Sequence, residues 1–124
     1  MSNPKFSHFR NRIKSVGFAL QGIVTFLKTQ INAWIHIGAA LFACILGYLL
    51  NINKTEWCVI VLAIGLVVVA EMLNTAIEFL TDLISPSIHP LAKKAKDVAA
   101  GAVLVAAITS VVIAAFIFLP KLLS

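Results

Sequence analysis

The sequence predicts an all-α membrane protein in which one amphipathic surface helix precedes three transmembrane helices. Of its 124 residues, 60% are hydrophobic and only 12% are charged, and the mean hydropathy is +1.00. A soluble domain carries about 25% charged residues. Three long apolar segments account for the low fraction of charged residues. A helix needs roughly 20 residues to cross a bilayer, and each segment reaches that length when its flanking residues are included.

The surface helix is expected at residues 6–28, where apolar and basic residues alternate with a helical period. Its apolar residues recur at three- and four-residue steps: Phe6, Phe9, Ile13, Val16, Leu20, Ile23, Val24 and Leu27. Arg10, Arg12, Lys14, Gln21 and Lys28 lie between them. Such a helix suits the membrane surface, because its basic face meets anionic lipid headgroups. The first residues are polar and basic, so no cleavable signal peptide is expected.

The transmembrane helices are expected at residues 33–50, 57–84 and 91–119, and together with the surface helix they form one domain, residues 1–124. His36 alone interrupts the first apolar segment. Polar residues 51–56 form the first turn. Pro86 and Pro90 mark the second link, because proline stops a helix and permits a new start. The third helix is expected to end before Pro120.

Basic residues predict the orientation of these helices. Lys and Arg gather in the N-terminal arm and at residues 93–96, whereas the opposite side carries only Lys54 and Lys121. The positive-inside rule therefore places the N-terminus in the cytoplasm and the C-terminus outside. Headgroup attraction also explains the net charge of +5 without nucleic-acid binding. Three apolar helices cannot enclose a deep interior, so a homo-oligomer is expected.

Four polar side chains, Glu71, Asn74, Glu78 and Asp82, share one face of the second transmembrane helix. At 100° per residue they fall within a sector of about 80° and extend over about 16 Å. The apolar length from Trp57 places Glu71 just inside the cytoplasmic boundary. A carboxylate at the centre of a membrane helix costs about 2.5–3.5 kcal/mol, so this stripe indicates a functional site. Interhelical hydrogen bonding remains the alternative, chiefly for Asn74.

The start of the third transmembrane helix adds charged groups at the same depth. Lys93 and Asp97 are one turn apart, and Lys96 adjoins Asp97. Alone, this pattern fits a helix start that faces headgroups. Beside the stripe, Lys96 can contact phosphates while Glu78 and Asp97 hold Mg²⁺, which prefers one or two carboxylates with phosphate oxygens. Glu71 then remains as a base for a lipid hydroxyl. The chain has no G-x-x-x-x-G-K-[ST] loop, so the site is not a common phosphate loop.

These residues resemble the signature of the prokaryotic diacylglycerol kinase family, which includes undecaprenol kinases. The motifs "AEMLNTAIEFLTD" (70–82) and "HPLAKKAKDVAAGAVLVAAI" (89–108) carry the resemblance, with weaker echoes in "GFALQG" (17–22) and "NAWIH" (32–36). The resemblance implies an ATP- and Mg²⁺-dependent lipid kinase at the cytoplasmic face of the bacterial inner membrane. It also implies a homotrimeric helical bundle whose active sites are shared between neighbouring chains.

The resemblance further implies the roles of individual residues. Glu71 is the general base that activates the lipid hydroxyl, Asn74 orients the reacting groups, and both contact the lipid. Glu78 holds Mg²⁺. The residues expected to bind the nucleotide are Asn74, Glu78, Asp82, Lys96 and Asp97. His36 and His89 lie within the motifs, where helix packing or headgroup contact is expected of each.

Two positions depart from the family pattern. Gln30, in "TQIN", stands where family members carry a glutamate that binds metal and ATP. An amide adds no charge to Mg²⁺, so weaker metal binding or loss of activity is expected. Asn11 stands nearest to the family's nucleotide-contacting arginine. Arg10 or Arg12 is expected to substitute, with Arg12 favoured.

Two other functions and two substrates remain open at this point. A small proton-coupled transporter can be built around one membrane glutamate, but it leaves Glu78, Lys96 and Asp97 unexplained. A catalytically weakened or inactive family member is kept open by Gln30. Diacylglycerol and undecaprenol are both retained as substrates. The motif that begins at residue 89 resembles undecaprenol kinases somewhat more.

Overall fold

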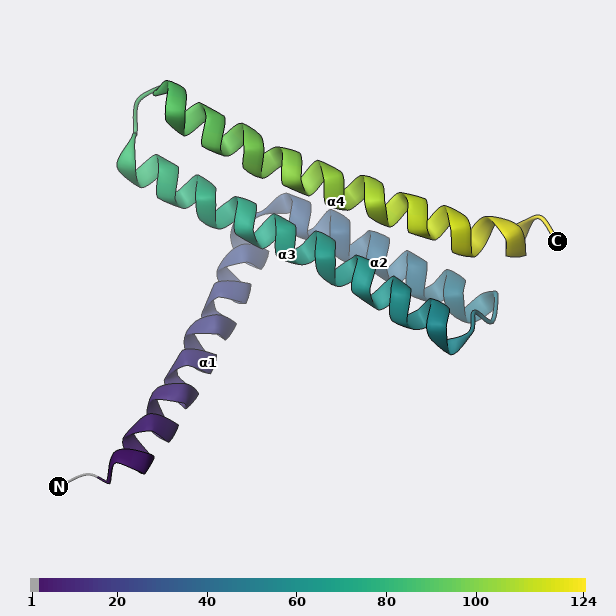
Figure 1. Ribbon diagram of the computed structural model, residues 1–124, viewed down its shortest axis with the longest axis horizontal. Coiled ribbons are helices and arrows are strands. Elements are labelled where there is room, and N and C mark those ends of the chain that lie inside the picture. Colours follow the sequence, from purple (N-terminus) through teal and green to yellow (C-terminus); the bar gives the residue numbers. More distant parts are fainter. Residues whose placement is uncertain (1–2) are drawn as a thin grey trace. The chain divides into compact units, whose positions relative to one another are not determined.

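The computed structural model describes residues 3–124, which form four α-helices joined by short connections (Figure 1). The helices are α1 (Pro4–Thr29), α2 (Ile31–Leu49), α3 (Lys54–Ile84) and α4 (Pro90–Leu122). No β-strand occurs in this part of the chain, and the all-α prediction is confirmed. The chain divides into two units, Met1–Ile31 and Asn32–Ser124.

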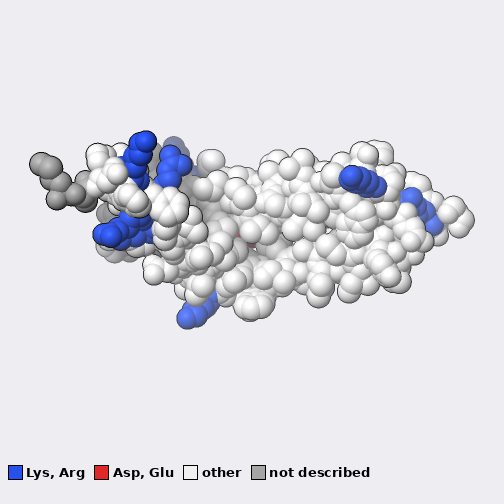
Figure 2. Space-filling model, turned by 90° about the horizontal axis from the view of Figure 1, so that it is seen from below, with Lys and Arg blue, Asp and Glu red and all other residues white. Residues whose placement is uncertain are grey.

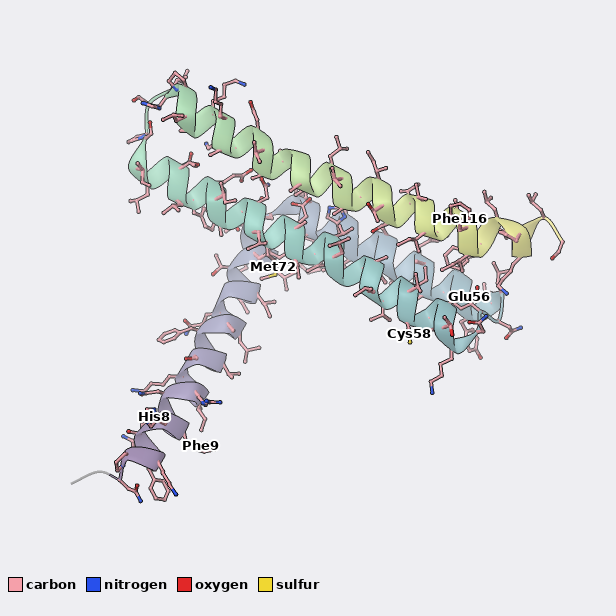
Figure 3. The ribbon with its side chains drawn as sticks, in the orientation of Figure 1. His8, Phe9, Glu56, Cys58, Met72 and Phe116 are labelled. Carbon is pink, nitrogen blue, oxygen red and sulfur yellow. The ribbon has the colours of Figure 1, made fainter. Side chains whose placement is uncertain are left out.

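The first unit consists mainly of α1, which is amphipathic as the sequence predicts. Asn3 caps the helix by accepting a hydrogen bond from the backbone N–H of Lys5. Pro4 fits the first turn, where the missing N–H would have had no partner. In the first two thirds of α1, large apolar side chains such as Phe9, which is labelled in Figure 3, are more than half exposed, whereas Phe26 near the end of the helix is buried. This face is therefore available to lipid.

In the second unit, α2, α3 and α4 are each long and apolar enough to cross a membrane. α3 has 31 residues and α4 has 33, so at 1.5 Å per residue they are about 46 and 50 Å long. Both exceed a hydrocarbon core of about 30 Å. Charged residues lie in the second half of α3 and the first turns of α4, and Lys54, Glu56 and Lys121 lie at the opposite ends of these helices. The surplus length is enough for charged residues near both ends of α3 and α4 to lie outside a hydrocarbon core of that thickness.

The helices α3 and α4 run antiparallel and pack along their length, while α2 lies beside the first half of α3 (Figure 1). The hydroxyl of Ser110 on α4 donates a hydrogen bond to the carbonyl oxygen of Ala63 on α3 at 3.2 Å. A cluster of Ile52, Ile60 and Phe118 forms the hydrophobic core at the end of the unit that lies farther from the polar stripe. These contacts hold α3 and α4 in fixed register.

The connection between α2 and α3 is closed by local hydrogen bonds. Asn51 has a φ of 52°, a left-handed conformation that asparagine tolerates better than most residues. Asn53 accepts a hydrogen bond from the backbone N–H of Glu56 at 2.9 Å and donates one to its Oε1 at 2.6 Å. Nζ of Lys121 lies 3.7 Å from the same oxygen. Glu56 thus links the start of α3 to the end of α4, the end where Figure 3 labels Phe116.

The surface of α2, α3 and α4 is largely apolar. Leu62, Val98 and Phe116 are 74%, 74% and 79% exposed, and uncharged side chains cover the middle of the face seen in Figure 2. Water disfavours so large an apolar surface, whereas lipid or another protein surface can cover it. The fold is that of a membrane protein. The homotrimer stays a prediction.

Candidate active site

Glu71 is the buried carboxylate of the candidate site. It lies on α3, and 5% of its surface is exposed. Its Oε1 atom lies 2.8 Å from Nε2 of His36 on α2. One turn along α3, the hydroxyl of buried Thr75 donates to the backbone carbonyl oxygen of Glu71 at 3.0 Å. The carboxylate is thus held at one oxygen by a neighbouring helix and is largely removed from water.

Asn74 and Glu78 form the next pair along α3. The amide Nδ2 of Asn74 donates a hydrogen bond to Oε1 of Glu78 at 3.2 Å. The amide oxygen Oδ1 of Asn74 is buried and has no hydrogen-bond partner in the described part of the chain. Leaving a buried polar atom unpaired costs about 1–3 kcal/mol. A bound ligand that contacts Oδ1 of Asn74 would explain why this buried oxygen has no partner within the protein.

The oxygen atoms of this pair suit a nucleotide-bound Mg²⁺ better than a metal held by protein alone. Within residues 3–124, no group of three or more His, Cys, Asp and Glu side chains is placed to hold a metal ion. Mg²⁺ bound with nucleotides needs only one or two carboxylates, because phosphate oxygens and waters complete its octahedron. Glu78, with Oδ1 of Asn74 beside it, fits that requirement.

Asp82 connects the polar stripe of α3 to the charged start of α4. Nζ of Lys96 forms an ion pair with Oδ1 of Asp82. On α4 itself, Nζ of Lys93 lies 2.7 Å from Oδ2 of Asp97, the one-turn pair that the spacing predicts. All four side chains are at least 42% exposed. Exposed ion pairs contribute about 0–1 kcal/mol to stability, so these lysines can exchange a carboxylate for a phosphate at little cost.

These ion pairs border a pocket of about 370 Å³ beside the α3–α4 connection. Its charged lining residues are Asp82, Lys93, Lys96 and Asp97, and residues 85–89 complete one wall. Ala92 and Lys93, in the first turn of α4, also line this pocket. His89 caps α4, since its Nδ1 accepts a hydrogen bond from the backbone N–H of Leu91 at 3.1 Å. His89 therefore has a structural role here.

A second cavity, of about 320 Å³, lies among α2, α3 and α4. Its walls are mainly alanine and branched apolar side chains, with His36 and Ser110 as the polar ones. The His36 side chain therefore lines this cavity and hydrogen-bonds Glu71 at the same time. Apolar surroundings of this kind strengthen the electrostatic interactions of the pair.

Arg12 and Gln30 lie in the first unit of the chain. Arg12 is exposed on α1. Gln30 is the C-terminal cap of that helix, and its backbone N–H donates to the carbonyl oxygen of Phe26 at 3.0 Å. The roles of Arg12 and Gln30 in nucleotide or metal binding stay predictions.

The partner of Glu71 is the feature of this site that sequence reasoning missed. The sequence predicts helix packing or headgroup contact for His36 and indicates no partner for it. The available signal was its position, because a polar side chain within an apolar membrane segment is costly and is generally paired. The residue most in need of a donor at that depth was Glu71.

Comparisons with known proteins point to one family. Residues 17–118 match the family model described as prokaryotic diacylglycerol kinase. The chain is 48% identical over 109 residues to an undecaprenol kinase of Bacillus subtilis, with 88% of this chain and 89% of that protein covered. It is 40% identical over 115 residues to a diacylglycerol kinase of Synechocystis, with 92% of this chain and 66% of that protein covered. For a diacylglycerol kinase of Escherichia coli the identity is 30% over 111 residues, with 84% of this chain and 85% of that protein covered.

Proposed function

The chain belongs to the prokaryotic diacylglycerol kinase family and is a membrane lipid kinase, and from this premise we propose that it transfers the γ-phosphoryl group of ATP to a lipid hydroxyl. The observation that carries the proposal is the buried carboxylate of Glu71, on one helix face with Asn74 and Glu78. A buried carboxylate in a membrane helix is costly, and a role as a base accounts for it.

Glu71 is the general base of the proposed reaction. Its carboxylate takes the proton of the lipid hydroxyl while the hydroxyl oxygen forms a bond to the γ-phosphorus of ATP. The bond between that phosphorus and the bridging oxygen breaks, and ADP leaves with the electron pair. A positioned base contributes about 10²- to 10⁴-fold to a rate. The remaining catalysis comes from placing the two substrates and balancing charge on the phosphates.

Charged residues at the cytoplasmic end hold the nucleotide. Lys96 gives up its ion pair with Asp82 and contacts a phosphate, while Asp97 borders the same pocket. Glu78 and the amide oxygen of Asn74 are the groups that would hold Mg²⁺, and the bound ion would neutralise phosphate charge. The unpaired Oδ1 atom of Asn74 supports this assignment. Nucleotide binding by Arg12 and Gln30, with a metal contact for Gln30, is proposed from the family resemblance alone.

The lipid is a membrane alcohol, either undecaprenol or diacylglycerol. Identity of 48% with an undecaprenol kinase, against 40% and 30% with two diacylglycerol kinases, favours undecaprenol. We place the chain in the bacterial inner membrane as a homotrimer, with its N-terminus in the cytoplasm. ATP is cytosolic, so the α3–α4 connection must face that side, in agreement with the basic residues at positions 93–96.

A weakened kinase is the second candidate, because Gln30 stands where the family carries a carboxylate. The proton-coupled transporter loses its support, since the chain belongs to a family of kinases. One assay separates a competent kinase from a weakened one: purified protein, labelled ATP, Mg²⁺ and each lipid alcohol in turn. The proposal expects lipid-dependent transfer of label that falls at least 100-fold in Glu71→Gln. Transfer that persists undiminished in that variant would remove the assigned base.

A further inference from the structure

The hydrogen bond between His36 and Glu71 joins two helices that pack less closely than α3 and α4 do. The His36 side chain is 23% exposed and that of Glu71 is 6% exposed. The cavity among α2, α3 and α4 borders His36 on its apolar side. The imidazole thus spans from the cavity wall of α2 to the carboxylate on α3.

We propose that His36 is a positioning residue for the reaction, holding Oε1 of Glu71 and leaving Oε2 to accept the proton of the lipid hydroxyl. This inference rests on the proposed role of Glu71 as the base. A carboxylate can rotate about its side-chain bonds, and a donor fixed on another helix restricts that rotation. Misplacing a reacting group by about 1 Å can lower a rate about 100-fold.

Histidine suits this task because one ring nitrogen donates while the ring packs against apolar side chains. A neutral imidazole carries one N–H donor and no net charge. It can therefore orient a carboxylate without the strong neutralisation that a lysine or arginine would bring. The other polar group at the cavity, the hydroxyl of Ser110, is already bonded to the carbonyl oxygen of Ala63. The structure thus offers His36 as a side-chain donor to this carboxylate.

The competing explanation is that the pair only holds α2 against α3. Interhelical hydrogen bonds in membranes contribute to stability in this way. The two roles differ in what they do to kcat. A purely structural contact changes thermal stability and leaves the turnover of the folded enzyme intact, whereas a positioning contact lowers kcat and leaves KM for ATP unchanged.

Two amide variants of the full chain separate the roles, because both are polar and differ mainly in reach. The amide nitrogen of glutamine extends about as far as Nε2 of histidine, whereas that of asparagine falls short. We expect His36→Gln to keep most of kcat and His36→Asn to lose about 10- to 100-fold, with KM for ATP unchanged in both. Ser110→Ala is the control, since it removes an interhelical hydrogen bond at the same cavity and should leave kcat unchanged.

A double-mutant cycle tests whether His36 acts through Glu71. In the Glu71→Gln background, adding His36→Asn should cause no further loss of the residual kcat, because the group being positioned has gone. An equal loss in both backgrounds would overturn the inference. So would an unchanged kcat in His36→Asn together with a lowered melting temperature. If Glu71→Gln alone kept full turnover, the proposed base itself would be wrong, and this inference would fall with it.

Discussion

Asn74 donates a hydrogen bond to Glu78 one turn along α3, while its own amide oxygen is buried without a partner. This pair therefore offers the negatively charged carboxylate of Glu78 and the neutral amide oxygen of Asn74. Of the two groups, the amide oxygen has no hydrogen-bond partner in the described part of the chain. An unpaired buried oxygen lowers the stability of the folded protein, but both oxygens are suitable ligands for a metal-bound nucleotide. The pair provides two predictions, one about metal dependence and one about stability.

The Glu78→Gln variant should need more Mg²⁺ for activity. The substitution keeps the size of the side chain and removes the charge that attracts the cation. We expect the Mg²⁺ concentration at half-maximal activity to rise at least about 10-fold, a factor worth about 1.4 kcal/mol of binding free energy. A magnesium titration at fixed ATP and lipid measures it. Glu56→Gln is the matched control, because Glu56 lies at the opposite end of α3, and an equal shift there would contradict the assignment.

The Asn74→Leu variant should be more stable and less active than the parent chain. Leucine has a similar size and leaves no unpaired buried oxygen, so it removes a cost of about 1–3 kcal/mol. Loss of the hydrogen bond to Glu78 offsets about 1 kcal/mol of this gain. Thermal unfolding in detergent micelles would record the higher melting temperature, and kcat in the same preparation would record the loss. A variant that is both less stable and fully active would mean that Asn74 serves packing alone.

The Lys96→Gln variant should weaken ATP binding. Lys96 is paired with Asp82 at the pocket beside the α3–α4 connection, and the proposal has its ammonium group contact a phosphate instead. We expect KM for ATP to rise about 10-fold, which corresponds to about 1.4 kcal/mol of binding free energy. KM should also depend less on ionic strength, because the attraction between the Lys96 ammonium group and a phosphate, which salt screens, has been removed. Lys94→Gln is the control, since Lys94 is exposed on the same turn of α4 and does not line that pocket. Equal changes in both variants would point to a general effect of positive charge.

The helical fold was predictable because long apolar segments leave few alternatives, whereas the helix ends depend on local geometry. α3 begins at Lys54 rather than at residue 57, because Asn53 caps it through Glu56. α4 runs through Pro120 to Leu122, beyond the expected end at residue 119. The backbone N–H of Leu123 still bonds the carbonyl oxygen of Leu119 at 3.0 Å, so the proline sits in the last turn without ending it.

The shared face of the polar stripe was predictable because a helical period fixes it. The contact between Asn74 and Glu78 follows from a spacing of four residues, as does the pair of Lys93 and Asp97 on α4. Contacts between helices were not predictable in this way. The bond from His36 to Glu71 depends on how α2 lies against α3, and no spacing within one helix contains that information.

The Gln30→Glu variant should bind Mg²⁺ more tightly and turn over faster, if the position carries the function that the family resemblance implies. A carboxylate would add one negative charge next to a cation that already has few protein ligands, and Mg²⁺ prefers charged oxygens. We expect the half-maximal Mg²⁺ concentration to fall several-fold, measured by the same titration as for Glu78→Gln. Gln21→Glu, exposed on α1, is the control for a general change in surface charge. Should both variants respond alike, or neither, Gln30 would have no special link to the metal, and the departure from the family pattern would be of no catalytic consequence.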